Sequence, residues 1–170
     1  MAAAPVAVDR EVDFTRFYRR HRPALIAFAS RRVSQADVDD LVAEAFIRAY
    51  QSLPVTVWGI EGDSRAWLFR VLQNLLISAA RRRSTADREH RTIGASDVHD
   101  DERNLEAVES DIEAAFRGLP MRQSTVLELR FLLDFDVATT ASIMELSHDG
   151  VRSLTHRALR ALRSSLEGHQ

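Results

Sequence analysis

Apolar residues recur three and four positions apart along most of the chain, which is the spacing of one face of an α-helix. The segments with this spacing are residues 11–32, 36–52, 65–83, about 105–118, about 121–132, about 137–145 and 148–166. Glycine and proline are scarce, at 6 and 4 residues, whereas a sheet protein needs many turns. The pattern therefore predicts an all-α fold.

The ends of the predicted helices carry capping and breaking residues. Ser34 and Ser64 stand where the N-caps of the second and third helices are expected. Pro23 is expected either to kink the first helix or to start another one. Pro54 ends the helix before it and opens residues 54–63, which contain two glycines and are expected to form a loop.

A stretch that is poor in apolar residues divides the chain. Residues 84–104 contain only two large aliphatic residues, too few to form a core. Residues 97–113 hold eight carboxylates against a single arginine. We therefore expect two small helical domains, residues 1–83 and 105–170, joined by a flexible acidic linker over residues 84–104.

The composition is that of a soluble globular protein, with 45% hydrophobic and 28% charged residues. The absence of cysteine excludes disulfide bonds and thiolate metal sites and fits a reducing cytoplasm. The amino-terminal residues lack the basic region of a signal peptide, and no apolar run approaches the roughly 18 residues of a membrane helix. A cytoplasmic location without membrane insertion is expected.

All 23 basic residues are arginine, and they gather in blocks. Residues 65–91 hold seven of them, and the last predicted helix is basic again. The guanidinium group makes forked contacts to phosphates and base edges, so these blocks favour nucleic-acid binding. A GC-rich genome would also produce many arginines, but it explains their total and not their clustering.

Residues 137–163 have the layout of a helix-turn-helix, whose second helix enters the major groove of DNA. Leu146 closes a tight turn and Ser147 caps the second helix. The expected shared core consists of Val137, Ala141, Ile143, Leu146, Val151 and Leu162. A polar stripe away from that core consists of Arg152, His156, Arg160 and Arg163. An amphipathic helix whose arginines are merely solvated is the alternative.

Only the amino-terminal part of a recognition helix normally reaches base edges. We therefore assign base-proximal roles to His148, Arg152, Ser153 and His156. Backbone or solvent roles fall to Arg157, Arg160 and Arg163.

The loop at 54–63 and the helix after it form a second candidate nucleic-acid surface. A polar stripe on that helix consists of Arg70, Asn74, Ser78 and Arg81. Aromatic side chains stack on bases and arginines hold the backbone of opened, single-stranded DNA. Trp58 and Trp67 are the candidate aromatics, although Trp67 is more simply explained as core. Trp58, in a predicted loop, is less easily explained that way.

Nothing in the sequence indicates an enzyme. Asp37, Asp40 and Glu44 lie near one face of a helix and suggest a magnesium site, but acids at a helix start are commonly solvated there. A docking face for a protein partner is a third interpretation of these acids. The histidines lack zinc-site spacing, and no nucleophile elbow, phosphate loop or dinucleotide fingerprint occurs. No catalytic residue, metal or cofactor is expected.

Four segments occur in an order that is typical of one family. They are 39-DDLVAEAFIRAY-50, 66-AWLFRVLQNLLISAARRR-83, 119-LPMRQSTVLELRF-131 and 147-SHDGVRSLTHRALRALR-163. Together they resemble the extracytoplasmic-function (ECF, group IV) sigma factors of the sigma-70 family, from about Phe14 to about Leu166. The resemblance implies a bacterial transcription initiation factor that binds core RNA polymerase, reads the -35 and -10 promoter elements and promotes melting.

The resemblance also implies roles by position. Docking on the clamp helices of the largest β-type subunit of polymerase falls to Asp39, Asp40, Glu44, Phe46 and Arg48. Capture of the melted -10 strand falls to Trp58, Arg65, Arg70, Gln73, Asn74, Ser78, Arg81 and Arg82. Recognition of the -35 duplex falls to Ser147, His148, Arg152, Ser153, Thr155, His156, Arg157 and Arg160.

Further partners follow from the same resemblance. The carboxyl-terminal domain is expected to contact the polymerase flap, and an anti-sigma factor is an additional candidate partner. The linker resembles the segment that threads toward the active centre, where its carboxylates mimic RNA phosphates.

This chain departs from the family pattern in its second domain. Glu145 occupies the turn position where the family often has glycine. Leu154 and Thr155 stand where the family often has arginine followed by leucine, so one usual DNA-contacting arginine is missing. The loop before Arg65 is also shortened. A standard promoter sequence is therefore not transferred to this protein.

Three other functions fit parts of the pattern. A stand-alone helix-turn-helix regulator would bind duplex DNA without polymerase. A sigma-like decoy would act only through protein contacts. A carboxylate metalloenzyme would use the acids at 37, 40 and 44.

Overall fold

The computed structural model describes residues 10–58, 63–91 and 111–167. These residues form helices and connecting turns without any strand, which confirms the predicted all-α class. The chain divides into two compact units, Met1–Asp97 and Val98–Gln170. None of the helices within the described ranges is both long enough and apolar enough to cross a membrane.

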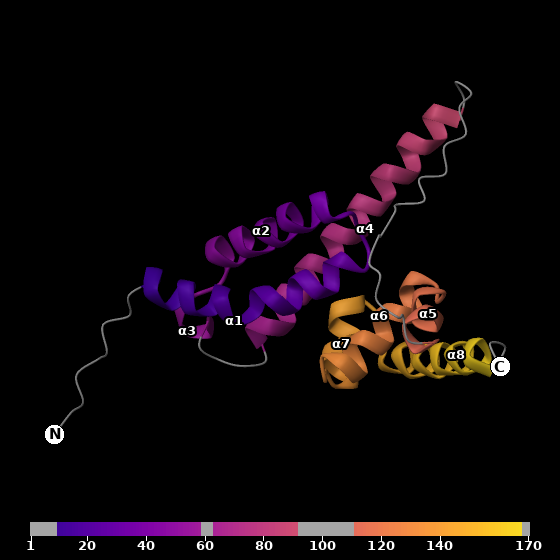
Figure 1. Cartoon of the computed structure of the whole chain (residues 1–170). Helices are drawn as coiled ribbons and strands as arrows, with labels where there is room; N and C mark the ends of the chain where they lie inside the picture. Colours follow the sequence, from indigo (N-terminus) through magenta and orange to yellow (C-terminus); the bar gives the residue numbers. More distant parts are fainter. Residues whose placement is uncertain (1–9, 59–62, 92–110, 168–170) are drawn as a thin grey trace. The chain divides into compact units, whose positions relative to one another are not determined.

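The first unit is built from α1 (Arg10–Ser30), α2 (Gln35–Ser52), the short α3 (Val55–Trp58) and α4 (Asp63–Arg91) (Figure 1). α2 packs against both α1 and α4, and α3 packs against α1. Its core is mostly aliphatic and phenylalanine side chains, among them Phe17, Leu25, Phe28, Val38, Val42, Phe46, Leu68, Phe69, Leu72 and Leu76. The helical spacing of these residues explains why each helix buries one face.

The connection between α1 and α2 is largely as predicted. α1 continues through Pro23 as a single helix, so the expectation that a second helix starts there is wrong. Ser34 has the extended backbone of an N-cap residue, but its hydroxyl lies 2.6 Å from the Asp37 carboxylate rather than capping a backbone N–H. α2 ends at the predicted place, with Leu53 as its C-cap.

The segment between α2 and α4 differs from the prediction. Val55–Trp58 form a helical turn where a loop was expected, and residues 59–62 lie outside the described residues. Ser64 is inside α4 and buried, so it is not the N-cap.

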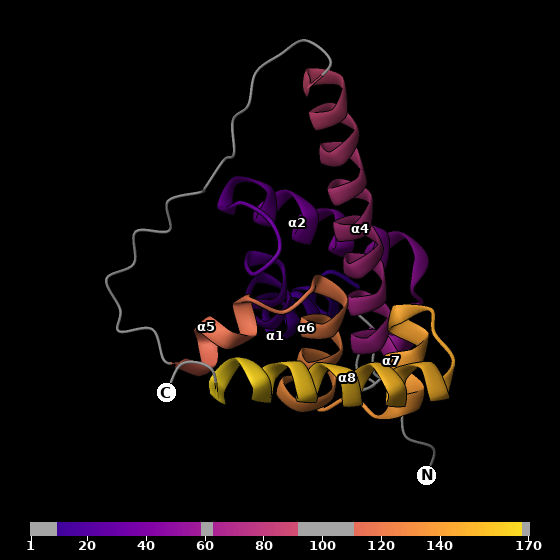
Figure 2. The same ribbon diagram turned by 90° about the vertical axis from the view of Figure 1, so that its right-hand side faces the viewer.

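α4 is longer than predicted, because it continues past residue 83 to Arg91. Figures 1 and 2 show its carboxyl-terminal half extending beyond α1 and α2. Once a helix is nucleated, each added residue gains one hydrogen bond, and residues 84–91 contain no glycine or proline. The first part of the predicted linker is therefore helical, and the rest of it lies outside the described residues.

The second unit contains α5 (Asp111–Arg117), α6 (Met121–Leu127), α7 (Val137–Met144) and α8 (His148–Glu167). α5, α6 and α7 pack along α8 (Figure 2). Their buried core consists of Leu119, Val126, Leu127, Ala141, Val151, Leu154 and Ala158. α6, α7 and α8 begin where helices were predicted, and α5 lies within its predicted range, of which residues 105–110 lie outside the described residues.

The helix predicted over about 121–132 changes geometry in its second half. Glu128–Leu132 form a π-helical turn, η1, in which the Leu133 N–H donates to the Glu128 carbonyl at 2.9 Å. Phe131 and Leu132 on this turn are exposed, while Leu129 is fully buried. The wider turn thus ends the helix and leads the chain into α7.

Candidate nucleic-acid interface

α7 and α8 form the predicted helix-turn-helix, and each of the two helices starts with a capping side chain. The Asp136 carboxylate accepts a hydrogen bond from the Thr139 N–H at 2.6 Å at the start of α7. The Ser147 hydroxyl accepts one from the Gly150 N–H at 3.0 Å at the start of α8. The predicted Ser147 cap is therefore confirmed, and the beginning of α8 is held in a defined position.

The turn between the two helices requires a left-handed residue. Glu145 has φ 52° and ψ 50°, and the Leu146 N–H donates to the Ala141 carbonyl at 3.0 Å. Glycine adopts this conformation without steric cost, whereas a residue with a Cβ does not. The glutamate therefore places a small strain at the centre of the motif.

α8 has one buried face and one basic face. Val151, Leu154 and Ala158 are buried against α5, α6 and α7. The exposed face carries the whole predicted stripe, namely Arg152, His156, Arg160 and Arg163, together with His148, Ser153 and Arg157. The predicted separation of core and basic stripe is confirmed.

The structure shows the surroundings of the two positions on α8 where the sequence departs from the family pattern. Leu154 belongs to the core cluster, so the position faces inward and not toward a DNA groove. Thr155 is half-buried, and its hydroxyl donates to the Val151 carbonyl at 2.7 Å. Leu154 therefore contributes to packing, and the Thr155 hydroxyl to a local hydrogen bond within α8.

α4 carries the second polar stripe. Arg70, Ser78, Arg81 and Arg82 are exposed and Asn74 is half-buried, so the stripe forms a continuous face of the helix. The Ser78 hydroxyl donates to the Asn74 carbonyl at 2.9 Å. Arg65 lies at the start of α4 with its guanidinium carbon 5.8 Å from the centroid of the Phe69 ring.

Two residues predicted to contact the melted strand are buried instead. Trp58 is only 5% exposed and lies on α3, with its ring 5.2 Å from Phe14 and stacked on Phe17 at 6.3 Å. Gln73 is also 5% exposed, and its Oε1 has no hydrogen-bond partner. Trp67, which was expected to be core, is half-buried. The structure therefore contradicts the expectation for Trp58, whereas Trp67 is only partly buried.

α2 presents most of the predicted docking residues on its surface. Asp39, Asp40 and Arg48 are exposed, and Glu44 is half-buried. Arg48 donates to Glu44 at 2.7 Å. Phe46 is the exception, because it is buried and its ring lies 4.6 Å from Tyr18. Its side chain belongs to the core and supports the surface from within.

Two acids near the start of α2, Asp37 and Asp39, have protein partners. The Asp37 carboxylate accepts from Ser34 and from Arg83, and these contacts hold its pKa below the ordinary 3.8. Asp39 is paired with Arg22 at 3.1 Å. Across the described ranges, no three His, Cys, Asp or Glu side chains are grouped as a metal site would require.

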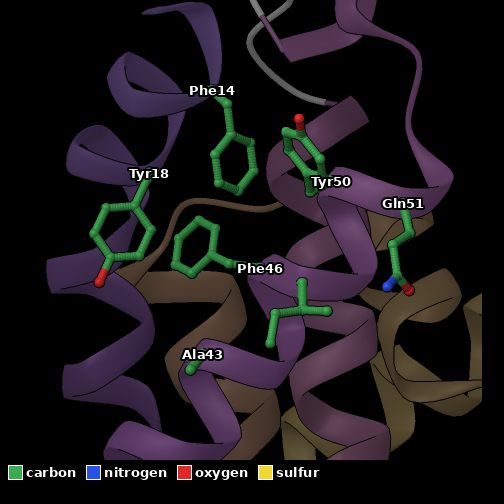
Figure 3. A pocket seen from close by; sticks show the side chains of 7 residues that line it. Phe14, Tyr18, Ala43, Phe46, Tyr50 and Gln51 are labelled. Carbon is green, nitrogen blue, oxygen red and sulfur yellow. The ribbon is translucent and has the colours of Figure 1, made fainter. Parts of the chain in front are cut away.

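An apolar groove between α1 and α2 was not anticipated from the sequence. Its volume is about 430 Å³, and it is lined by Phe14, Tyr18, Ala43, Phe46, Ile47, Tyr50 and Gln51. Figure 3 shows Phe14 and Tyr18 of α1 facing Phe46 and Tyr50 of α2. Ile47 is 50% exposed beside them. In the sequence, this groove could have been suspected from Ile47, a large apolar residue that lies outside the buried stripe of α2.

Comparison with known proteins identifies both units. The family model Sigma-70 region 2 matches residues 17–85, and the model Sigma-70, region 4 matches residues 109–162. Together they span most of the chain and place one region of the same family in each unit.

Curated relatives are similar over nearly the whole chain. The ECF RNA polymerase sigma factor SigL of Mycobacterium tuberculosis is 29% identical over 98% of this chain and 93% of that protein. BldN of Streptomyces coelicolor, another ECF RNA polymerase sigma factor, is 31% identical over 88% of this chain and 58% of its own length. The ECF RNA polymerase sigma-E factor of Escherichia coli is 29% identical over 87% and 83%.

Solved structures share the fold. The sigma factor RpoE of Bartonella quintana, in complex with the anti-sigma factor NepR, matches with a TM-score of 0.70 and 24% identity over 91% of this chain and 97% of that one. CnrH, in complex with the cytosolic domain of CnrY, matches with a TM-score of 0.60 and 22% identity over 96% of this chain and 99% of that one.

The two units contain two regions of one family in the expected order. This arrangement does not favour a stand-alone regulator. The chain belongs to the sigma-70 family, as a transcription initiation factor of the ECF group.

Proposed function

We propose that the two units divide promoter recognition between them, with α8 reading the -35 duplex and α4 holding the melted -10 strand. The observation that carries this proposal is the exposed basic face on each of these helices, one in each sigma region. Core RNA polymerase is the proposed partner for both steps, and it performs the synthesis. The chain itself has no catalytic role and acts in the cytoplasm.

For the -35 element, the capped amino-terminal turns of α8 support base reading. His148, Arg152, Ser153 and His156 lie on the exposed side of these turns. Ser147, Thr155, Arg157 and Arg160 complete the proposed contact surface. Contacts from the later arginines to phosphates would fix register, whereas the first turns would supply sequence discrimination.

For the -10 element, the exposed stripe of α4 supports contact with single-stranded DNA. Arg70, Arg81 and Arg82 would hold the backbone, and Asn74 would bind an unstacked base. Ser78 and Arg65 border this surface. Trp58 and Gln73 are left out of it because their side chains are buried.

For polymerase docking, the exposed face of α2 is the proposed surface. Asp39, Asp40 and Arg48 are exposed on it, and half-buried Glu44 pairs with Arg48 at its edge. We assign this face to the clamp helices and the second unit to the flap. An anti-sigma factor is the proposed regulatory partner, because the fold matches RpoE as bound to NepR.

Transcription by the purified chain with and without core polymerase tests the proposal. Promoter-dependent runoff should appear only with core enzyme, and the free chain should give no tight sequence-specific gel shift. Strong specific binding by the free chain would instead identify a stand-alone regulator. Core binding without initiation would identify a decoy, and absence of core binding would overturn the proposal.

A substitution on α4 separates the two roles of the first unit. Asn74→Ala should impair opening at the -10 element, measured by permanganate reactivity, while core affinity stays unchanged. Thr15→Ala, at an exposed position on α1, serves as the control. A matched loss of core affinity in Asn74→Ala would mark this residue as structural.

A further inference from the structure

We propose that Asp149 determines specificity at the -35 element by positioning Arg152 for one guanine. The inference rests on the proposed function, in which α8 reads the upstream duplex. Asp149 is the second residue of α8 and was not among the residues expected to contact DNA.

The geometry of the pair supports this role. The Asp149 Oδ1 lies 2.9 Å from the Arg152 Nη1, across one turn of α8. The Asp149 side chain is 91% exposed and that of Arg152 is 64% exposed. Both therefore stand on the open side of the helix, next to the Ser147 cap that fixes its start.

The atoms used by the ion pair leave the reading edge of the arginine free. A guanidinium has five N–H donors in a fixed plane, and Asp149 engages only Nη1. The edge formed by Nε and Nη2 keeps two parallel donors. That edge matches the N7 and O6 acceptors of guanine, which arginine reads with two hydrogen bonds. Because Asp149 holds Nη1, the Arg152 side chain has fewer rotamers before it binds DNA. Its loss of conformational entropy on binding is therefore smaller.

Charge explains why the effect should appear as specificity and not as affinity. A carboxylate on the DNA-facing side of α8 repels phosphates, so it weakens binding to every sequence. An exposed ion pair of this kind also contributes little to folding stability. We therefore expect the Asp149–Arg152 pair to contribute to discrimination among bases, and not to overall affinity or to folding stability.

The same helix offers a matched control. Arg163 and Glu167 form an ion pair of 2.8 Å near the carboxyl-terminal end of α8, also between exposed side chains. Glu167→Gln removes one negative charge from α8, as Asp149→Asn does. It does so far from the turns that reach base edges.

The experiment selects upstream sequences with the reconstituted holoenzyme. The probe is a duplex library randomised upstream of a fixed -10 element, and the variants are Asp149→Asn, Arg152→Ala, the double variant and Glu167→Gln. Arg152→Ala should lose a guanine preference at one position, on the order of tenfold. Asp149→Asn should weaken the preference several-fold at that same position, while binding to random duplex is unchanged or tighter. Glu167→Gln should leave every base preference unchanged.

The double variant distinguishes the possible failures. It should show no further loss of discrimination beyond Arg152→Ala, because Asp149 acts through that residue. If Arg152→Ala changes a base preference and Asp149→Asn does not, the positioning role is overturned and the proposed function stands. If Asp149→Asn changes the preference at a base position other than the one read by Arg152, the carboxylate reads a base directly. That result would also overturn the positioning role. If neither variant changes any preference, the assignment of α8 to the -35 element fails as well.

Discussion

The imidazole ring of His21 lies edge-on to the phenyl ring of Phe17 in the first unit, with centroids 4.8 Å apart. His21 is buried, and its pKa is lowered from 6.5 to about 4, mainly by burial and additionally by the charges of Arg20 and Arg65. The histidine is therefore neutral in the folded protein at neutral pH. Protonation of the folded protein at this residue therefore costs free energy.

This relationship predicts a loss of stability in mild acid. Between pH 6.5 and about 4 the unfolded chain binds a proton at His21 that the folded chain does not. Stability is thus fully present above pH 6.5 and falls as the pH drops toward 4, by on the order of 2–3 kcal/mol. Urea unfolding followed by tryptophan fluorescence across this range measures it.

His21→Leu is the control for this effect. It should flatten the pH dependence of stability between pH 6.5 and about 4. Asp37, whose pKa is lowered from 3.8, affects stability mainly near and below pH 3.8, which is outside this range. An unchanged slope in His21→Leu would contradict the assignment to this histidine.

The left-handed turn residue predicts a stabilising substitution. Glu145→Gly should raise the free energy of unfolding of the second unit by about 1 kcal/mol, because glycine adopts φ 52° without a Cβ clash. Thermal unfolding of the intact chain measures the change. Ser142→Gly, at an exposed position inside α7, should instead destabilise, since glycine weakens a helix interior. Equal effects of the two substitutions would be the contrary result.

The two tryptophans should behave differently. Trp58→Ala should destabilise the first unit by about 3–5 kcal/mol, because it leaves a cavity beside Phe14 and Phe17. Trp67→Ala should cost less, since Trp67 is half-buried.

Fluorescence provides an independent measurement for this pair. Trp67→Phe leaves only Trp58, whose emission should resist iodide quenching, and Trp58→Phe leaves the more accessible Trp67. Efficient quenching of Trp58 would show that it is exposed in solution and available for stacking on a base.

The buried amide of Gln73 predicts a tolerated apolar substitution. Gln73→Met removes an unpaired Oε1 at nearly constant shape, so stability should be unchanged or rise by up to about 1 kcal/mol. Promoter opening should persist, because the side chain does not reach the surface. Loss of opening with intact folding would return Gln73 to the DNA surface.

Local pattern was sufficient for most of the helices and for the exposed basic face of α8. The spacing of Val151, Leu154 and Ala158 and the position of Ser147 already specify which side of that helix is buried and where it starts. Both properties depend on residues a few positions apart, so they are visible in the chain itself.

Tertiary packing alone decided which predicted contact residues are available. Phe46 and Trp58 are buried against aromatic side chains of α1, Gln73 is buried as well, and the groove beside Ile47 exists only because α1 lies against α2. Helical periodicity specifies which residues share a face, but not which neighbour covers that face.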